Sequence, residues 1–267
     1  MRRSSRTVKS RQMNNKKVSF SIYVALRALV VVCIILQIIG GKFDNVFLCI
    51  FYLALLMLPM LVQDKFKIEL PSLLEIIIYL FIFSGTVLGE IHNFYGNIHH
   101  WDTMLHFING FICAGIGFSL VDIFHKNVKK INLSPLYMAF VAICFSMMVG
   151  ASWELFEYSA DKLLLTDMQK DTIVKTISTV ELDPLKNNHS VVIKGIEKTV
   201  LYDKSGNEVA IIEGGYLDIG LNDTMKDLAF DFMGAVLFSI FGYFYMRNKN
   251  KCKFIKNFIP ERVERKG

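Results

Sequence analysis

Long runs of apolar residues, separated by short polar connections, make up most of the chain. Each run reaches the roughly 17 residues that an α-helix needs to cross a hydrocarbon core about 30 Å thick. Apolar residues fill the whole of each run and do not recur only on one helix face. The pattern predicts an all-α fold, a polytopic bundle of about six transmembrane helices. The expected spans are residues 20–39, 46–62, 71–89, 103–124, 135–158 and 227–246.

The long connection between the fifth and sixth runs, residues 159–226, has a different pattern. Its stretch TVLYDKSGNEVAII, residues 199–212, places β-forming residues on both sides of a Ser-Gly-Asn turn. That arrangement predicts a small extracytoplasmic β-hairpin insertion. A two-stranded ribbon is marginal by itself, so we expect it to lie on the outer surface of the bundle. We favour the interpretation that the insertion is solvated and has no site of its own.

The distribution of Lys and Arg predicts the orientation in the membrane. The net charge is +6, but the basic residues gather in the two tails and in two short connections. The positive-inside rule places these segments in the cytoplasm and segment 90–102, which has no Lys or Arg, outside. The long connection 159–226 then also lies outside, because six spans alternate in direction. We therefore expect a multi-pass cell-membrane protein that binds no nucleic acid. The basic positions used are Arg2, Arg3, Arg6, Lys9, Arg11, Lys16, Lys17, Lys65, Lys67, Lys126, Lys129, Lys130, Arg247, Lys249, Lys251, Lys253 and Lys256.

These assignments divide the chain into three parts. Residues 1–19 form a basic cytoplasmic tail, residues 20–246 form the transmembrane bundle, and residues 247–267 form a second basic cytoplasmic tail. The extracytoplasmic loop 159–226 interrupts the bundle. Both termini are then cytoplasmic, as six spans require.

Ionisable side chains gather at the expected outer ends of three helices. Asp102 and His106 are four residues apart, so they share one face of the fourth helix. Glu154 and Glu157 share a face of the fifth helix, and Asp227 and Asp231 share a face of the sixth. Because consecutive helices alternate in direction, the three groups lie at a similar depth.

Placing these groups inside a membrane is costly. Each charge at mid-bilayer costs about 2.5 to 3.5 kcal/mol on insertion scales, and less near the interface. We therefore expect the groups to be hydrated, protonated, paired or bound to a cation, and to meet in one polar cavity open to the outside. The predicted site comprises Asp102, His106, Glu154, Glu157, Asp227 and Asp231.

Three motifs resemble a known family. WDTMLHF at 101–107, WELFEY at 153–158 and NDTMKDLAFDFMGA at 222–235 resemble the YjdF-like uncharacterised membrane proteins, within the VanZ-like superfamily. That resemblance implies a helical membrane protein of the cell envelope with its site at matching positions. It does not name a reaction, although VanZ itself is associated with glycopeptide resistance. The implied site residues are Asp102, His106, Glu154, Asp227 and Asp231.

Three functions remain open at this point. The first is an outward-facing site that binds a lipid headgroup, a lipid-linked wall intermediate or an antimicrobial ligand. The second is a membrane-embedded metal-dependent hydrolase acting on a lipid, with His106, Asp102 and Glu154 as ligands of a divalent metal such as Zn²⁺. A proton-coupled transporter is the third and least favoured, because it would need acidic residues along the full depth of the bundle, and here they cluster on one side. The expected partners are the bilayer and a lipid or lipid-linked ligand, and the sequence defines neither catalysis nor an oligomeric state.

Overall fold

The computed structural model describes residues 2–125, 133–248 and 252–262, and it contains six helical segments long and apolar enough to cross a membrane. The prediction of an all-α bundle with six spans is thereby confirmed. Lys126, Lys129, Lys130, Lys249 and Lys251, which entered the orientation argument, lie outside the described residues. The six segments are Asn15–Ile39, Asn45–Lys65, Ser72–Ile91, Trp101–Val121, Pro135–Leu164 and Leu221–Arg247.

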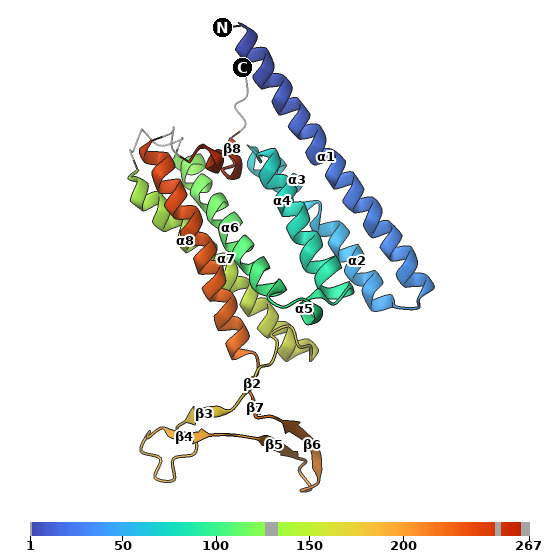
Figure 1. Cartoon of the computed structure of the whole chain (residues 1–267), viewed down its shortest axis with the longest axis vertical. Coiled ribbons are helices and arrows are strands. Elements are labelled where there is room, and N and C mark those ends of the chain that lie inside the picture. The colour runs from blue at the N-terminus through green and yellow to red at the C-terminus, as the bar shows by residue number, and fades with distance from the viewer. Residues whose placement is uncertain (1, 126–132, 249–251, 263–267) are drawn as a thin grey trace. The chain divides into compact units, whose positions relative to one another are not determined.

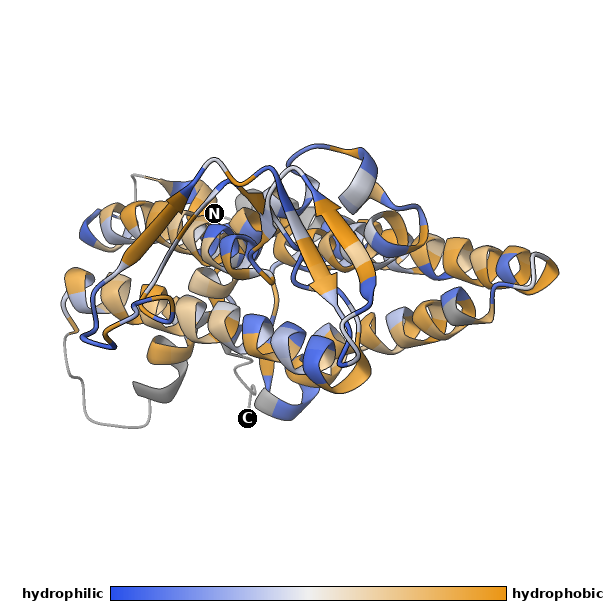
Figure 2. Cartoon of the chain, turned by 90° about the horizontal axis from the view of Figure 1, so that it is seen from below, coloured by the Kyte–Doolittle hydropathy of each residue, from blue (hydrophilic) through white to orange (hydrophobic). Residues whose placement is uncertain are grey.

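The chain forms two compact units. Residues 1–151 and 227–267 form the helix unit, and Ser152–Lys226 form the strand unit. Apolar residues make up most of the long helices (Figure 2), and many large apolar side chains on them are exposed, as expected of a surface facing lipid.

The first half of the helix unit is built from the first three spans (Figure 1). Helix α1 (Arg2–Ile39) ends before Gly41, whose φ of +69° suits glycine at a helix C-terminus. Helices α2 (Phe43–Leu55) and α3 (Leu58–Phe66) form the second span. The third comprises α4 (Ser72–Phe83) and a π-helix, η1 (Ser84–Ile91). Their shared core is completely buried at Val30, Cys49, Tyr52 and Leu56.

The second half contains α6 (Trp101–His125), α7 (Pro135–Leu164) up to Ala151, and α8 (Leu221–Arg247) from Asp227 onward. Small residues let α6 and α8 touch through their backbones. A Cβ atom added at Gly110 would overlap the carbonyl oxygen of Asp231, and one added at Gly234 would overlap that of Phe107. Ser146 of α7 donates a hydrogen bond of 2.9 Å to the carbonyl of Gly110. Close approach and interhelical serine bonds are typical of packing in membranes.

A polar network joins α1, α3 and α4 at the opposite end of the bundle from α5 (Phe94–Asn97). Glu75 accepts hydrogen bonds from Ser19 (2.5 Å) and from Gln63 (3.1 Å). Arg27 donates to the hydroxyl of Tyr23 at 2.5 Å and lies over its ring. These contacts satisfy polar groups within an otherwise apolar half of the unit.

The segment after α8 packs back onto the helix unit. It forms a short 3₁₀ helix, η2 (Lys253–Phe258), and a strand, β8 (Glu261–Arg262), which pairs with β1 (Ile68–Glu69). Ile255 is completely buried, and the ring of Phe258 meets that of Phe111 edge-on at 5.1 Å. The C-terminal segment predicted as a basic tail therefore contains an ordered contact with the bundle.

The strand unit contains three antiparallel ribbons of two strands each. The predicted hairpin is confirmed, because β5 (Lys198–Tyr202) pairs with β6 (Glu208–Glu213). Two further pairs were not predicted: β3 (Thr176–Thr179) with β4 (Val191–Lys194), and β2 (Ile173–Val174) with β7 (Tyr216–Leu217). Strands of two to four residues carry too little alternation to be recognised in a sequence.

Candidate functional site

The start of α6 is held in place by an aromatic anchor. Trp101 donates its indole N–H to the carbonyl of Ser84 at 3.3 Å, and its ring meets Phe94 edge-on at 5.0 Å. Asp102 follows in the first turn, where the helix dipole favours an acidic side chain. The anchor therefore fixes the end of α6 that carries the first predicted site residues.

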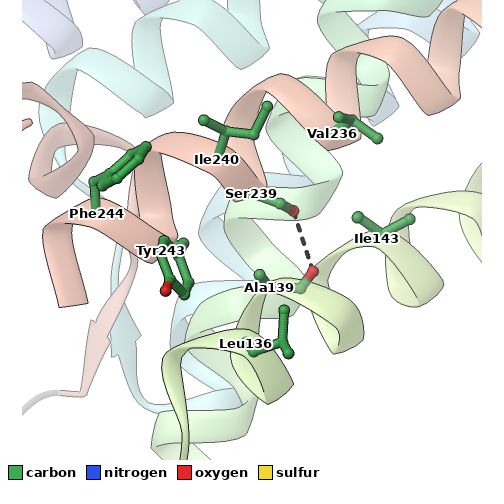
Figure 3. Close-up of a pocket in the computed structure, with 8 residues that line it drawn as sticks. All are labelled: Leu136, Ala139, Ile143, Val236, Ser239, Ile240, Tyr243 and Phe244. Atoms are coloured by element: carbon green, nitrogen blue, oxygen red, sulfur yellow. Dashed lines mark hydrogen bonds between the residues drawn. The ribbon is translucent and has the colours of Figure 1, made fainter. Parts of the chain in front are cut away.

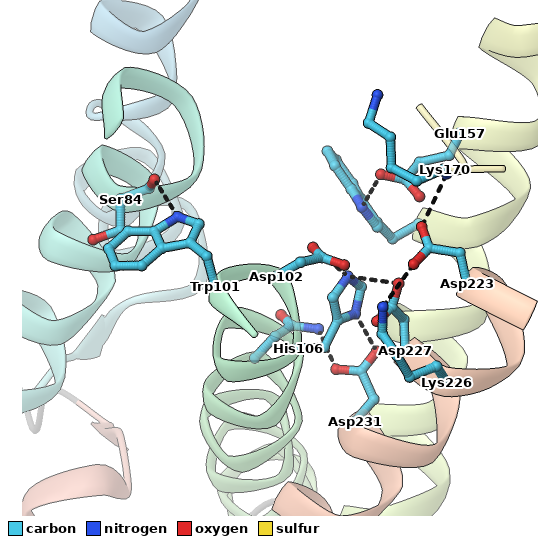
Figure 4. A network of polar contacts seen from close by, with 12 residues as sticks. Ser84, Trp101, Asp102, His106, Glu157, Lys170, Asp223, Lys226, Asp227 and Asp231 are labelled. Atoms are coloured by element: carbon cyan, nitrogen blue, oxygen red, sulfur yellow. Dashed lines mark hydrogen bonds and ion pairs between the residues drawn. The ribbon is translucent and has the colours of Figure 1, made fainter. Parts of the chain in front are cut away.

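His106 is surrounded by three carboxylates (Figure 4). Its Nδ1 lies 3.3 Å from Oδ2 of Asp231. Its Nε2 lies 3.6 Å from Oδ1 of Asp102 and 3.8 Å from Oδ2 of Asp227. His106, Asp227 and Asp231 are buried, and Asp102 is half-buried. Four of the six predicted site residues thus meet in the helix unit, and we call them the His106 cluster.

Asp231 is fixed by neighbours on two other helices. Asn109, one turn along α6 from His106, donates a hydrogen bond of 2.9 Å to Oδ1 of Asp231. On α7 a Cβ atom at Gly150 would crowd Oδ2 of Asp231, so glycine leaves room for the carboxylate. Asn109 was not among the predicted site residues, although its position on the face of Asp102 and His106 was a usable signal.

The two ring nitrogens of His106 face different carboxylates of the His106 cluster. Asp231 faces Nδ1 and could orient the ring, while Asp102 and Asp227 share the side of Nε2. Ligand atoms of Asp102, His106 and Asp227 all lie within 4.8 Å of one another, as a shared metal ion requires. This trio differs from the predicted ligand set in having Asp227 where the sequence suggested Glu154.

Glu154 and Glu157, the other two predicted site residues, belong to the strand unit. Glu154 is 4% exposed, and Glu157 accepts a hydrogen bond of 3.0 Å from the indole of Trp153. Asp161, one turn further along, accepts bonds from the amides of Met168 and Gln169 and so closes the loop after α7. The acidic residues at this end of α7 therefore differ in role, and Asp161 stabilises the local structure of the loop.

Residues 22–248 match the model of a family described as predicted membrane protein (DUF2238). The chain belongs to this family, and its six apolar helical segments make it a multi-pass membrane protein. An uncharacterised protein of Thermotoga maritima is 32% identical over 98 residues, which are 36% of this chain and 48% of that protein. The chain thus spans about half the length of this curated relative. No solved structure matches the chain.

Proposed function

We propose that the His106 cluster binds a divalent metal ion through which the protein binds a phosphate-bearing lipid headgroup. The observation that carries the proposal is the convergence of ligand atoms from Asp102, His106 and Asp227 within 4.8 Å. Imidazole and carboxylate groups are ordinary ligands of Zn²⁺ and related divalent ions.

The distances within the trio support a metal better than they support hydrogen bonds. The separations of 3.6 and 3.8 Å from Nε2 of His106 to Asp102 and Asp227 exceed normal hydrogen-bond lengths. Metal–ligand bonds of about 2.0 to 2.2 Å in a tetrahedron place neighbouring ligand atoms roughly 3.4 Å apart. A small inward movement of the two carboxylates would therefore suffice to coordinate an ion.

Charge supports the same conclusion. With its three carboxylates ionised, the cluster carries a net negative charge whether the imidazole is protonated or neutral. Burying such charge within a membrane protein is unfavourable without a compensating cation. A bound divalent ion would supply that compensation and would present a positive centre to a phosphate.

We propose that the cluster opens to the outer face of the cell membrane, with both chain termini in the cytoplasm. The Lys and Arg distribution supports this orientation. The VanZ-like and YjdF-like resemblance supports a role in the cell envelope, where lipid headgroups and lipid-linked wall intermediates are available ligands.

A metal-dependent lipid hydrolase is the second candidate. Asp102, His106 and Asp227 would provide three protein ligands, and catalytic zinc sites keep a fourth position open for water. Asp231 would hold His106 from the far side, as carboxylates beyond the ligands do in metal sites. Glu157, the sequence-based candidate for a general base, belongs to the strand unit.

The test is elemental analysis of the full-length protein purified without chelators. We expect about one equivalent of divalent metal in the wild type and background levels in Asp227→Ala and His106→Ala. Asp64→Asn, which removes an exposed acid on α3, should keep the wild-type content. Glu154→Gln should keep it too if Asp227 is the third ligand. Metal at background in a folded wild-type protein that also fails to take up added Zn²⁺ or Mn²⁺ would refute the proposal.

Lipid binding is measured separately on the same preparations. The metal-loaded protein should bind phosphatidylglycerol in vesicles more tightly than the metal-free protein, and a chelator should remove that difference. Release of headgroup or acyl chain over time would identify the hydrolase. If the protein binds metal but the metal changes neither lipid binding nor lipid hydrolysis, the metal site stands and the headgroup function is refuted.

A further inference from the structure

An apolar groove runs between α7 and α8, and no residue of the His106 cluster lines it (Figure 3). It has a volume of about 400 Å³ and is open on one side. Leu136 and Ile143 of α7 line one wall, and Val236, Ile240 and Phe244 of α8 line the other. The polar group of Ser239 is satisfied inside the protein, because its hydroxyl donates to the carbonyl of Ala139 at 3.2 Å. The surface offered by the groove is therefore hydrocarbon.

A cation stands at one end of the groove. Arg247, in the last turn of α8, is exposed. It lies over the ring of Tyr243, which lines the groove, and donates to the hydroxyl of Tyr243 at 3.3 Å. The apolar wall thus ends at a positively charged group that remains accessible.

The groove and the turn of α8 that leads from it to Arg247 together match the depth of one leaflet of a bilayer. A helix rises about 1.5 Å per residue, so the stretch of α8 from Val236 to Arg247 covers about 16 Å. Half of a hydrocarbon core of about 30 Å is about 15 Å. A chain bound along this stretch would begin at the membrane surface and end near the middle of the bilayer.

We infer that this groove is a binding site for an anionic phospholipid, with an acyl chain along α7 and α8 and the phosphate at Arg247. Charge complementarity selects the anionic headgroup, because a basic side chain near the surface attracts anionic lipid. Under the orientation proposed above, the lipid belongs to the cytoplasmic leaflet, so this site is separate from the outer headgroup site. The inference itself depends on neither that orientation nor the metal.

The experiment uses full-length, delipidated protein in detergent and two lipids with identical dioleoyl chains, phosphatidylglycerol and phosphatidylcholine. Native mass spectrometry measures the bound fraction across a titration. Arg247→Gln should weaken phosphatidylglycerol binding about fivefold and leave phosphatidylcholine unchanged. Ile240→Trp, which fills the groove from a half-exposed position, should weaken both lipids about tenfold.

Two matched controls separate the site from general effects. Lys253→Gln removes an exposed charge on η2, and Met233→Trp adds the same bulk on α8 outside the groove. Both should bind each lipid within about twofold of the wild type, well below one factor of ten. Equal binding of the two lipids by the wild type, or no effect of Arg247→Gln, would overturn the headgroup assignment. A change of oligomeric state in Ile240→Trp, with lipid binding unchanged, would show that a second copy occupies the groove and would overturn the inference.

Discussion

Asp231 of α8 and His106 of α6 face each other at 3.3 Å through Oδ2 and Nδ1, which turns Nε2 of the ring toward Asp102 and Asp227. The contact joins residues 125 positions apart in the chain. It makes Asp231 a positioning residue for the proposed metal ligand His106, since the remaining oxygen of Asp231 is held by Asn109.

Asp231→Asn should therefore lower metal affinity without removing the ligands. We expect a loss of about 10- to 100-fold, the usual effect of changing a group that orients a ligand. Competition with a fluorescent zinc chelator measures the affinity, and saturating metal should restore full occupancy. Asp64→Asn is the control for loss of one acid. Unchanged affinity would mean that Asp231 only fills space beside Gly150.

The contact between α6 and α8 should be sensitive to a single methyl group. Gly234→Ala would drive a Cβ into the carbonyl of Phe107 and force the helices apart. Overpacking of this kind costs about 1–3 kcal/mol, so the unfolding temperature should fall measurably. Gly85→Ala is the matched control, because its added Cβ would lie 3.5 Å from the hydroxyl of Tyr95, an ordinary contact. Metal content measured at low temperature then reports whether the wider helix spacing also disrupts the His106 cluster.

The sequence predicted the six spans because each requires only a sufficiently long apolar run, which is a local property. It also indicated that Asp102 and His106 share a face, since helical periodicity decides that. Which residues complete the cluster depends on how three helices pack. The choice of Asp227 beside Nε2 depends on Gly110 and Gly234, which set the spacing and rotation of α6 and α8.

The short ribbons of the strand unit were missed for a different reason. Only β5 and β6 have enough β-forming residues around a recognisable turn to predict a pair. Pairing of β2 with β7 joins residues more than 40 positions apart, so no local turn sequence predicts it. The order within the loop after Val180 likewise comes from one side chain, Asp183, which accepts bonds from the amides of Leu185, Asn187 and His189.

The loop around Asp183 should loosen in acid. Hydrogen bonds from the backbone amide of His189 and from its neighbours hold the pKa of Asp183 below its usual value. Because the folded pKa is depressed, the stabilisation is complete above the unfolded pKa of about 3.9 and is lost as the pH falls through the folded value. Hydrogen exchange of peptides covering residues 181–190, corrected for intrinsic rates, should show protection at pH 6 that declines only below about pH 4. Asp183→Asn should reduce protection at pH 6, while Glu181→Gln in the same loop should not.

The proposed orientation makes opposite ends of the chain accessible from opposite sides. Cys252 follows α8, and a cysteine introduced at Lys204 would lie in the exposed turn between β5 and β6. In intact cells a membrane-impermeant maleimide should label Lys204→Cys in a background without Cys252. Labelling of Cys252 should require permeabilised cells. Labelling of Cys252 in intact cells would invert the topology and move the His106 cluster to the cytoplasmic side.

The strand unit should be replaceable down to its first ribbon. The pair β2–β7 brings residues 174 and 216 together, so exchanging residues 176–214 for Asn-Gly leaves a short loop that the existing ribbon can close. We expect this variant to purify as a monodisperse membrane protein with the wild-type metal content, because Asp102, His106 and Asp227 all belong to the helix unit.

The control for this replacement is a larger deletion that also removes β2 and β7, residues 172–218. It takes away Asp218, which accepts hydrogen bonds from the amides of Thr172 and Asn222 and so ties the ribbon to the start of α8. That variant should unfold at a lower temperature than the first, since the first turn of α8 loses a partner for one of its amides. If instead the variant with the smaller replacement stays folded but loses its metal, the segment 176–214 contributes to metal binding. The insertion would then have a function that its sequence did not suggest.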